Sequence, residues 1–201
     1  MGVASHGPYY IPGVEDIEEG EPMELTGDHL EYVIACLFLL AQHCPEFADD
    51  FQGLSDAVAN GGLSFGYAKI GSTADGRADS NTILLKPDIL TKAPREEVAS
   101  IVIHEWQHVK KGRAHFDHRE WVEDLPPERR KKFNTNGAMR PFEHLETILV
   151  EYRAMCCLLA AGVIDEIPEA VILREEYGRE IALETASMHG PPEPLPPTPD
   201  C

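Results

Sequence analysis

The stretch PREEVASIVIHEWQHVKKG, residues 94–112, decides the fold prediction because it holds a helix start, an apolar run and a helix end. Pro94 followed by acidic residues is typical of a helix N-terminus, and Gly112 after basic residues is typical of a C-terminus. His104 and His108 are four residues apart, so a helix places both imidazoles on one face, at the reach that tetrahedral Zn²⁺ requires. We therefore expect one helix that presents a histidine pair.

Glu105 follows the first of these histidines. At this position a carboxylate points to the side of the histidine face, where it can accept a proton from a metal-bound water without coordinating the metal. The pattern predicts a metal site with Glu105 as general base. Such a site also needs a third protein ligand and an open fourth position for water.

Two histidines further along the chain are candidates for the third ligand. One class of zinc sites uses a histidine six residues after the second, and this chain has Ala114 at that position. His115 is one residue late, and a slip of one residue points a side chain away from the metal. We therefore expect His115 and His118 to be solvated loop histidines.

A second class of zinc sites takes a glutamate from a later helix, which the sequence predicts over residues 141–161. That helix offers Glu143, Glu146 and Glu151. We favour Glu151, because its neighbours in sequence are apolar, so an unpaired carboxylate would be unfavourable there and a bound metal would explain it. Glu143 and Glu146 lie nearer the helix start, where the helix dipole by itself favours acidic residues.

Two segments carry a resemblance to a known clan. IVIHEWQHV, residues 101–109, resembles the metal-binding helix of the gluzincin clan of zinc peptidases, and the segment EYRA, residues 151–154, is similar to the ligand helix of the HtpX and CAAX-prenyl-protease group. Within the clan, the chain resembles a minimal soluble member rather than one family. The resemblance implies a general base and three zinc ligands, which are Glu105 and His104, His108 and Glu151.

The resemblance has two further consequences. The group commonly has Asp after the Ala of the second segment, and this chain has Met155, so we expect the usual carboxylate partner of a ligand histidine to be absent. The segment NTILLKPDIL, residues 81–90, resembles the edge strand and connection before the metal-binding helix, a strand on which such peptidases align an extended substrate.

The function implied is a zinc-dependent peptidase that acts on a peptide or protein substrate, with Zn²⁺ as cofactor. Glu105 would deprotonate the zinc-bound water and return the proton to the leaving amine. Two alternatives stay open: a catalytically inactive zincin-fold module for binding or regulation, and a zinc hydrolase of a non-peptide amide. The sequence does not choose among the candidates for an oxyanion donor, which are Tyr152, Arg153, Tyr177 and His189.

The predicted fold class is α+β, a mostly helical zincin-like domain with a small β-sheet or hairpin beside the active-site helix. We expect an irregular arm over residues 1–23, one domain over 24–190 and a disordered Pro-rich tail over 191–201. Trp106, Tyr152 and Phe142 are expected to pack in the core. The expected elements are helices over 28–43, 46–59, 94–111, 141–161 and 168–188, strands over 63–70 and 81–86, and a long loop over 112–140.

Charge and hydropathy exclude two classes of partner. The net charge of −18, from 35 acidic and 17 basic residues, would repel a nucleic acid. The longest apolar stretch, about residues 33–41, is shorter than the roughly 20 residues that a membrane span needs. The PxxP spacings of the tail are compatible with an SH3-type partner, but we expect a disordered terminus.

The five cysteines predict a reducing environment. Their number is odd, and Cys156 and Cys157 are adjacent in a predicted helix, so they would point about 100° apart. This arrangement does not resemble a disulfide framework, and we expect Cys36 and Cys44 to act as small core residues. With no secretory signal pattern at the N-terminus, the predicted location is cytoplasmic.

Overall fold

The computed structural model describes residues 22–68, 75–79, 81–110, 141–189, 195–199 and 201. In these residues the chain is mostly helical with one small mixed sheet, which confirms the predicted α+β class. The elements are β1 Met23–Glu24, α1 Asp28–His43, η2 Pro45–Phe47, α2 Ala48–Ala59, β2 Ser64–Tyr67, β3 Gly76–Asp79, β4 Thr82–Leu85, α3 Pro87–Lys92, α4 Arg95–Lys110, α7 Pro141–Ala160 and α8 Glu169–His189.

Some predictions fall outside the described residues. These are most of the predicted N-terminal arm, the predicted loop over residues 112–140 with His115 and His118, and the side chains of Phe142, Glu143 and His189. In the described part of the chain, no helix is both long and apolar enough to cross a bilayer.

The sheet differs from the predicted hairpin. Its strand order is β1-β2-β4-β3, and β2 and β4 run parallel, with Phe65 opposite Ile83. The segment between them, which glycine and aspartate residues marked as a loop, contributes β3, and β3 pairs with β4 in antiparallel fashion. The predicted edge strand, β4, is therefore an inner strand, and β3 lies at that edge of the described sheet. A strand is recognised in a sequence by alternating buried and exposed side chains. Among the described side chains of β3, only Ala78 is a buried apolar residue, so this pattern is weak.

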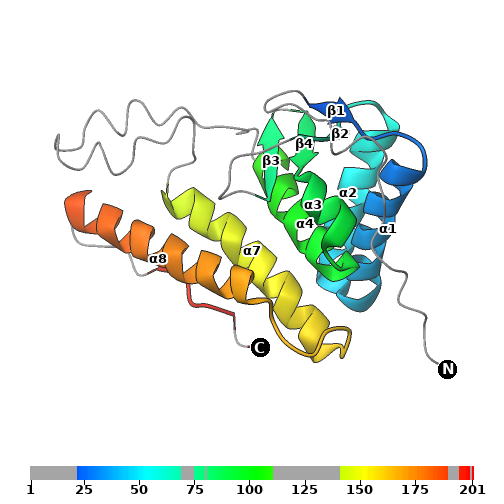
Figure 1. Cartoon of the computed structure of the whole chain (residues 1–201). Helices are drawn as coiled ribbons and strands as arrows, with labels where there is room; N and C mark the ends of the chain where they lie inside the picture. The colour runs from blue at the N-terminus through cyan, green and yellow to red at the C-terminus, as the bar shows by residue number, and fades with distance from the viewer. Residues whose placement is uncertain (1–21, 69–74, 80, 111–140, 190–194, 200) are drawn as a thin grey trace.

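Helix α4 lies at the centre of the fold. It contacts α1, α7 and the strands β3 and β4 (Figure 1). Residues 98–107 of this helix are all buried, including Val102 and Ile103. Ten consecutive buried residues go round the helix more than twice, so neighbours cover it on every side, and each buried valine or isoleucine contributes roughly 1.5–3 kcal/mol. The histidine pair thus lies on a helix that the core fixes from several directions.

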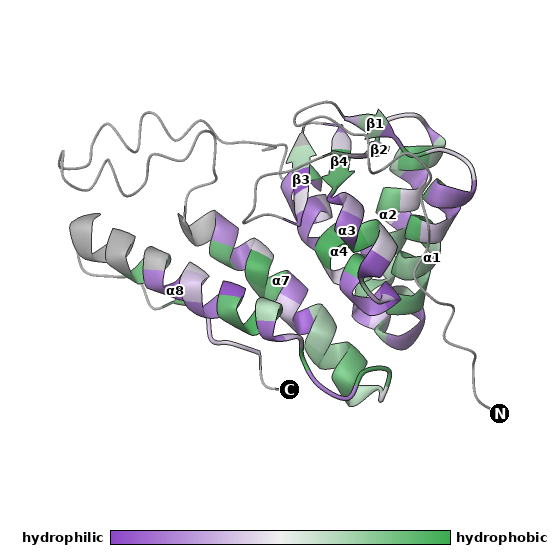
Figure 2. Ribbon diagram, viewed as in Figure 1, coloured by the Kyte–Doolittle hydropathy of each residue, from purple (hydrophilic) through white to green (hydrophobic). Residues whose placement is uncertain are grey.

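Helices α7 and α8 form a hairpin beside α4, and Figure 1 shows them running side by side. Hydrophobic and hydrophilic residues alternate along both helices (Figure 2), as expected for helices that bury one face. Gly162, with φ of 69°, ends α7 as predicted, because the amides of Gly162 and Val163 donate to the carbonyls of Leu159 and Leu158. This is the Schellman arrangement, which needs a left-handed residue.

The prediction of unpaired cysteines is wrong. Two disulfides join Cys44 to Cys157 and Cys156 to Cys201, with Cα–Cα distances of 5.9 and 4.8 Å, and Cys36 is free and buried. The adjacent cysteines do point in different directions, as the helix predicts, but each meets a partner brought close by the fold. Cys157 reaches the end of α1, and Cys156 reaches the C-terminal residue.

The described part of the tail contacts the hairpin rather than standing apart from it. Leu195 packs on a small cluster formed by Leu145, Leu149 and Ala182. The hydroxyl of Thr198 donates to Glu175 of α8 at 2.6 Å. Together with the bond between Cys156 and Cys201, these contacts hold residues 195–199 and 201 against α7 and α8, where the sequence predicted disorder.

Candidate metal centre

His104 and His108 lie one turn apart on α4 and face the same side. Their Nε2 atoms are 3.2 Å apart. Two nitrogens bound to one tetrahedral zinc ion at about 2.0–2.1 Å would be separated by roughly 3.3 Å. The pair therefore has the spacing of two ligands to a single ion.

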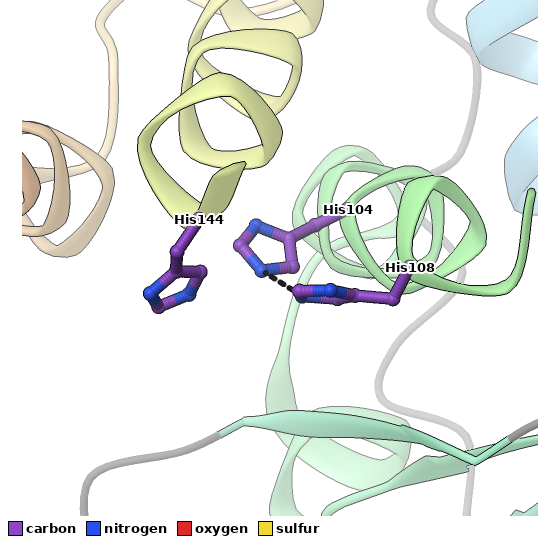
Figure 3. A group of neighbouring side chains, drawn as sticks. All are labelled: His104, His108 and His144. Atoms are coloured by element: carbon purple, nitrogen blue, oxygen red, sulfur yellow. Dashed lines mark hydrogen bonds between the residues drawn. The ribbon is translucent and has the colours of Figure 1, made fainter. Parts of the chain in front are cut away.

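His144, near the start of α7, joins this pair (Figure 3). One ligand nitrogen of each histidine lies within 4.8 Å of those of the other two. The ring of His144 stands edge-on to that of His104 at a centroid distance of 5.6 Å, and lies 5.8 Å from the ring of His108. His104 is buried and the other two are partly exposed, so solvent reaches the group.

Glu151, the predicted third ligand, lies elsewhere. Its Oε2 is 3.0 Å from Nδ1 of His104, the ring nitrogen opposite the Nε2 that faces His108. The observed geometry thus differs from the predicted ligand set, and His144 stands in the place assigned to Glu151. The two residues are seven positions apart on one face of α7, about 10 Å along the axis, so only one of them can lie level with the histidine pair.

Glu151 instead supplies the carboxylate partner that the sequence seemed to lack. The prediction that Met155 leaves the ligand histidine without such a partner is wrong, because Glu151 accepts from His104 and Met155 is buried in the core. A proton on Nδ1 of His104, donated to Glu151, leaves the lone pair of Nε2 directed at the other histidines. This is the tautomer that a metal ligand requires.

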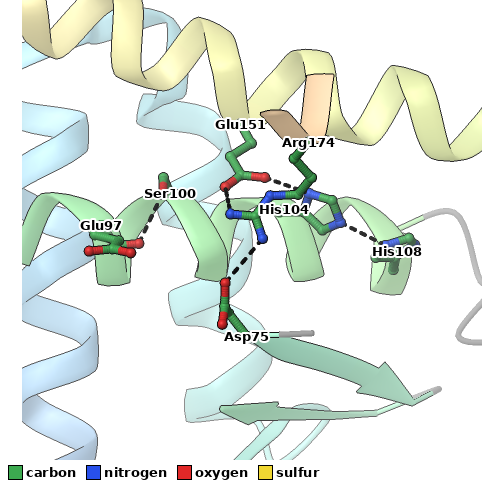
Figure 4. A network of polar contacts seen from close by, with 7 residues as sticks. All are labelled: Asp75, Glu97, Ser100, His104, His108, Glu151 and Arg174. Carbon is green, nitrogen blue, oxygen red and sulfur yellow. Dashed lines mark hydrogen bonds and ion pairs between the residues drawn. The ribbon is translucent and has the colours of Figure 1, made fainter. Parts of the chain in front are cut away.

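Arg174 of α8 and Asp75, just before β3, extend the contacts of Glu151 (Figure 4). Nη2 of Arg174 is 3.2 Å from Oε1 of Glu151, an ion pair without the alignment of a hydrogen bond. Nη1 of Arg174 donates to Oδ2 of Asp75 at 3.2 Å. Burial raises the pKa of Glu151 to about 7, and the positive charge of Arg174 opposes this shift.

Glu105 lies between α4 and β3 and is buried. Burial raises the pKa of this carboxyl to about 8; the charge of Glu151 acts in the same direction, and Arg174 and the backbone amide of Ala78 act against it. The close approach of β3 depends on Gly76, since a Cβ there would be 2.9 Å from Cγ and Oε1 of Glu105. Glu105 is thus confined to a narrow space and holds a proton more tightly than an ordinary glutamate.

The other predicted candidates with described side chains pack in the core or are exposed. Trp106 and Tyr152 pack with the main hydrophobic core, as predicted. Glu146 and Arg153 are exposed, and Tyr177 has 64% of its side chain exposed on α8. Of the four candidate oxyanion donors, none of the three with described side chains has a described contact with the centre.

The sequence contained a signal for His144 that the prediction missed. His144 and Glu151 are two helical turns apart, so a face of α7 that carries one also carries the other. The predicted third ligand on this helix was a carboxylate. Arg174 and Asp75 had no comparable signal, because their contacts join segments 99 residues apart in the chain.

Comparison of the chain with protein-family models, with curated proteins and with solved structures gives no match.

Proposed function

We propose that the chain is a zinc-dependent hydrolase of peptide bonds, with the ion held by His104, His108 and His144. The observation that carries the proposal is the convergence of three imidazole nitrogens within 4.8 Å of one another next to the buried Glu105. Three neutral imidazoles are a preferred ligand set for catalytic zinc, and a fourth position stays open for water. This set replaces the one with Glu151.

The residues around the histidines fit a cation. Burial raises the pKa of both Glu105 and Glu151, and the charge of Arg174 opposes the shift in both, joined at Glu151 by His144. A divalent ion beside them would lower the pKa of both carboxyls, so that they would be ionised near neutral pH. The hydrogen bond of Glu151 to His104 meanwhile keeps the ligand ring in its metal-binding orientation.

The reaction follows from the position of Glu105. A zinc ion in this place would lower the pKa of a water molecule to about 7 and polarise a carbonyl group. Glu105 would accept the proton of that water and donate it to the leaving amine. The close approach of Gly76 to Glu105 limits the space in which its carboxyl can move.

The sheet favours a peptide over another amide as substrate. β3 lies at the edge of the described sheet and contacts α4, the helix of the histidine pair. The outer backbone groups of such a strand can bind an extended peptide by adding it to the sheet. The sequence suggested residues 81–90 as the strand that aligns an extended substrate. We now propose β3 for this role.

The inactive-module alternative loses its main support. It rested on the missing carboxylate partner of a ligand histidine, and Glu151 occupies that place.

The two disulfides favour an oxidising compartment over the predicted cytoplasm, because disulfides are rare where thiols are kept reduced.

Digestion of a peptide library by the full chain tests the proposal. We expect cleavage that a chelator abolishes and added Zn²⁺ restores. Glu105→Gln should lower the rate by at least about 10²–10⁴-fold while zinc still binds, because the general base is lost and the ligands are kept. Glu96→Gln, on the same helix but in its first turn, is the matched control and should cleave normally.

Two results would count against the proposal. If zinc does not bind in equimolar amount and does not bind at the histidines, the proposed metal centre is wrong. Tight zinc binding without cleavage of any peptide would favour a binding module instead.

A further inference from the structure

Arg174 lies on α8, beside the candidate metal centre. No pattern in the sequence predicted a role for this residue. Its side chain is 23% exposed and extends from α8 to the space between α7 and β3. There it meets Glu151 and Asp75 at the same time, each at 3.2 Å. One guanidinium thus joins the two segments that enclose the centre beside α4.

The two oxygens of Glu151 have different tasks. Oε2 accepts from His104, and Oε1 faces Arg174. The hydrogen bond fixes Oε2, and the ion pair with Arg174 attracts Oε1 towards α8, so the two contacts together favour one orientation of the carboxylate. Glu151 is only 1% exposed, so in the intact structure Arg174 rather than solvent faces its Oε1. The direction of the His104 ring therefore depends on Arg174 through Glu151.

Asp75 gives the second half of the connection. It comes directly before Gly76, where β3 begins and passes close to Glu105. Nη1 of Arg174 holds Asp75, with Lys86 at 3.9 Å from the other oxygen. The guanidinium fork suits this arrangement because its planar donors can serve two carboxylates in fixed directions.

We propose that Arg174 is a positioning residue of the metal centre, which fixes Glu151 and thereby His104 for metal binding. The inference rests on the proposed zinc site. The route we infer runs from Arg174 through its ion pair with Glu151 to the hydrogen bond between Glu151 and His104.

Zinc affinity provides the test, with Zn²⁺ competed against a chromophoric chelator. Arg174→Met removes the guanidinium and keeps an unbranched side chain. We expect zinc affinity to fall by about 10-fold, the lower end of the range for losing a direct partner of a ligand histidine, because Arg174 acts one contact further away. Arg179→Met is the matched control. Arg179 lies on the same helix, is 21% exposed and pairs with Glu175, away from the centre, so zinc affinity should stay within about threefold of the wild type.

A double-variant cycle separates positioning from general loosening of the fold. In the Glu151→Gln background, Arg174→Met should cause little further loss, because its route to His104 has already been weakened. The visible absorption band of the Co²⁺-loaded protein should shift in Arg174→Met and stay unchanged in Arg179→Met. Arg174→Lys keeps the charge without the fork, and we expect partial recovery of affinity relative to Arg174→Met.

Several outcomes would overturn the inference. Arg174→Met with full zinc affinity and an unchanged Co²⁺ band would do so, as would additive losses in the double variant. If Arg174→Met does not fold, wild-type affinity in Arg174→Lys would be decisive against it. A wild-type chain that fails to bind zinc overturns the proposed function as well, whereas zinc binding that is indifferent to Arg174 overturns only this inference.

Discussion

The helices α4 and α7 face each other across the candidate metal centre, and they are held in place by different means. α4 is enclosed by α1, α7 and two strands, and its residues 98–107 are buried. α7 carries His144 and Glu151 on one face and depends on contacts from distant segments, namely Arg174 and the partners of Cys156 and Cys157. Both helices pack in the apolar core, α7 through residues such as Met155 and Leu158, but the α7 side of the centre also includes single polar and covalent contacts that can be removed one at a time.

The two roles assigned to α7 give the largest expected effect. His144→Ala removes a ligand, and Glu151→Gln removes the negative charge that orients one. We expect Glu151→Gln to weaken zinc binding by roughly 10–100-fold and His144→Ala to weaken it by more than that. Competition titration with Zn²⁺ measures both. The reverse order of losses would restore Glu151 as the ligand, as the sequence suggested.

On the α4 side, the sharpest test is Gly76→Ala. The new Cβ would lie 2.9 Å from Cγ and Oε1 of Glu105 and 3.0 Å from Ile101, so either Glu105 or β3 must move. A shift of about 1 Å in a reacting group lowers the rate by up to about 100-fold. We therefore expect kcat to fall by roughly 10–100-fold, with zinc affinity kept because all three histidines are untouched.

Gly62→Ala is the control for this substitution, since the nearest atom to its Cβ would be 3.5 Å away, an ordinary contact. Both variants should bind zinc like the wild type. Equal kcat in Gly76→Ala and Gly62→Ala would show that Glu105 is not the reacting base, or that it has more room than the structure gives it.

The same contrast explains how far the sequence could lead. The residues of α4 depend on spacing within one helix, and so the histidine pair and the start of the helix could be predicted. The α+β class and the end of α7 at Gly162 follow from similarly local patterns. These features require only the geometry of one helix or one turn.

The features that were missed depend on segments far apart in the chain. The parallel pairing of β2 with β4 and the insertion of β3 at the edge are decided by how the strands pack on α4, not by their own composition. The Asp75–Arg174 contact joins two such segments, and so do both disulfides. His144 is different, because helix spacing alone predicts that it shares a face of α7 with Glu151. The expectation of a carboxylate ligand led to Glu151 instead.

The disulfides on α7 give the smallest expected effects. Loss of a disulfide in a domain of this kind lowers the free energy of unfolding by about 2–5 kcal/mol. We expect a change in this range for Cys44→Ser, because this bond links α7 to the end of α1 in the core. Cys201→Ser should have a smaller effect, since it frees only the tail from α7. Urea unfolding at equilibrium measures both.

Thiol counting decides whether these bonds exist in the isolated protein. After denaturation without reductant, an alkylating reagent should label one cysteine, Cys36, and with reductant it should label all five. In the folded protein Cys36 should resist labelling, because burial raises its pKa to about 12 and keeps the thiol protonated. Five labelled cysteines without reductant would mean that α7 is held by its packing and by Arg174 alone. In that case Arg174→Met should lose more zinc affinity than it would if the two disulfides also held α7.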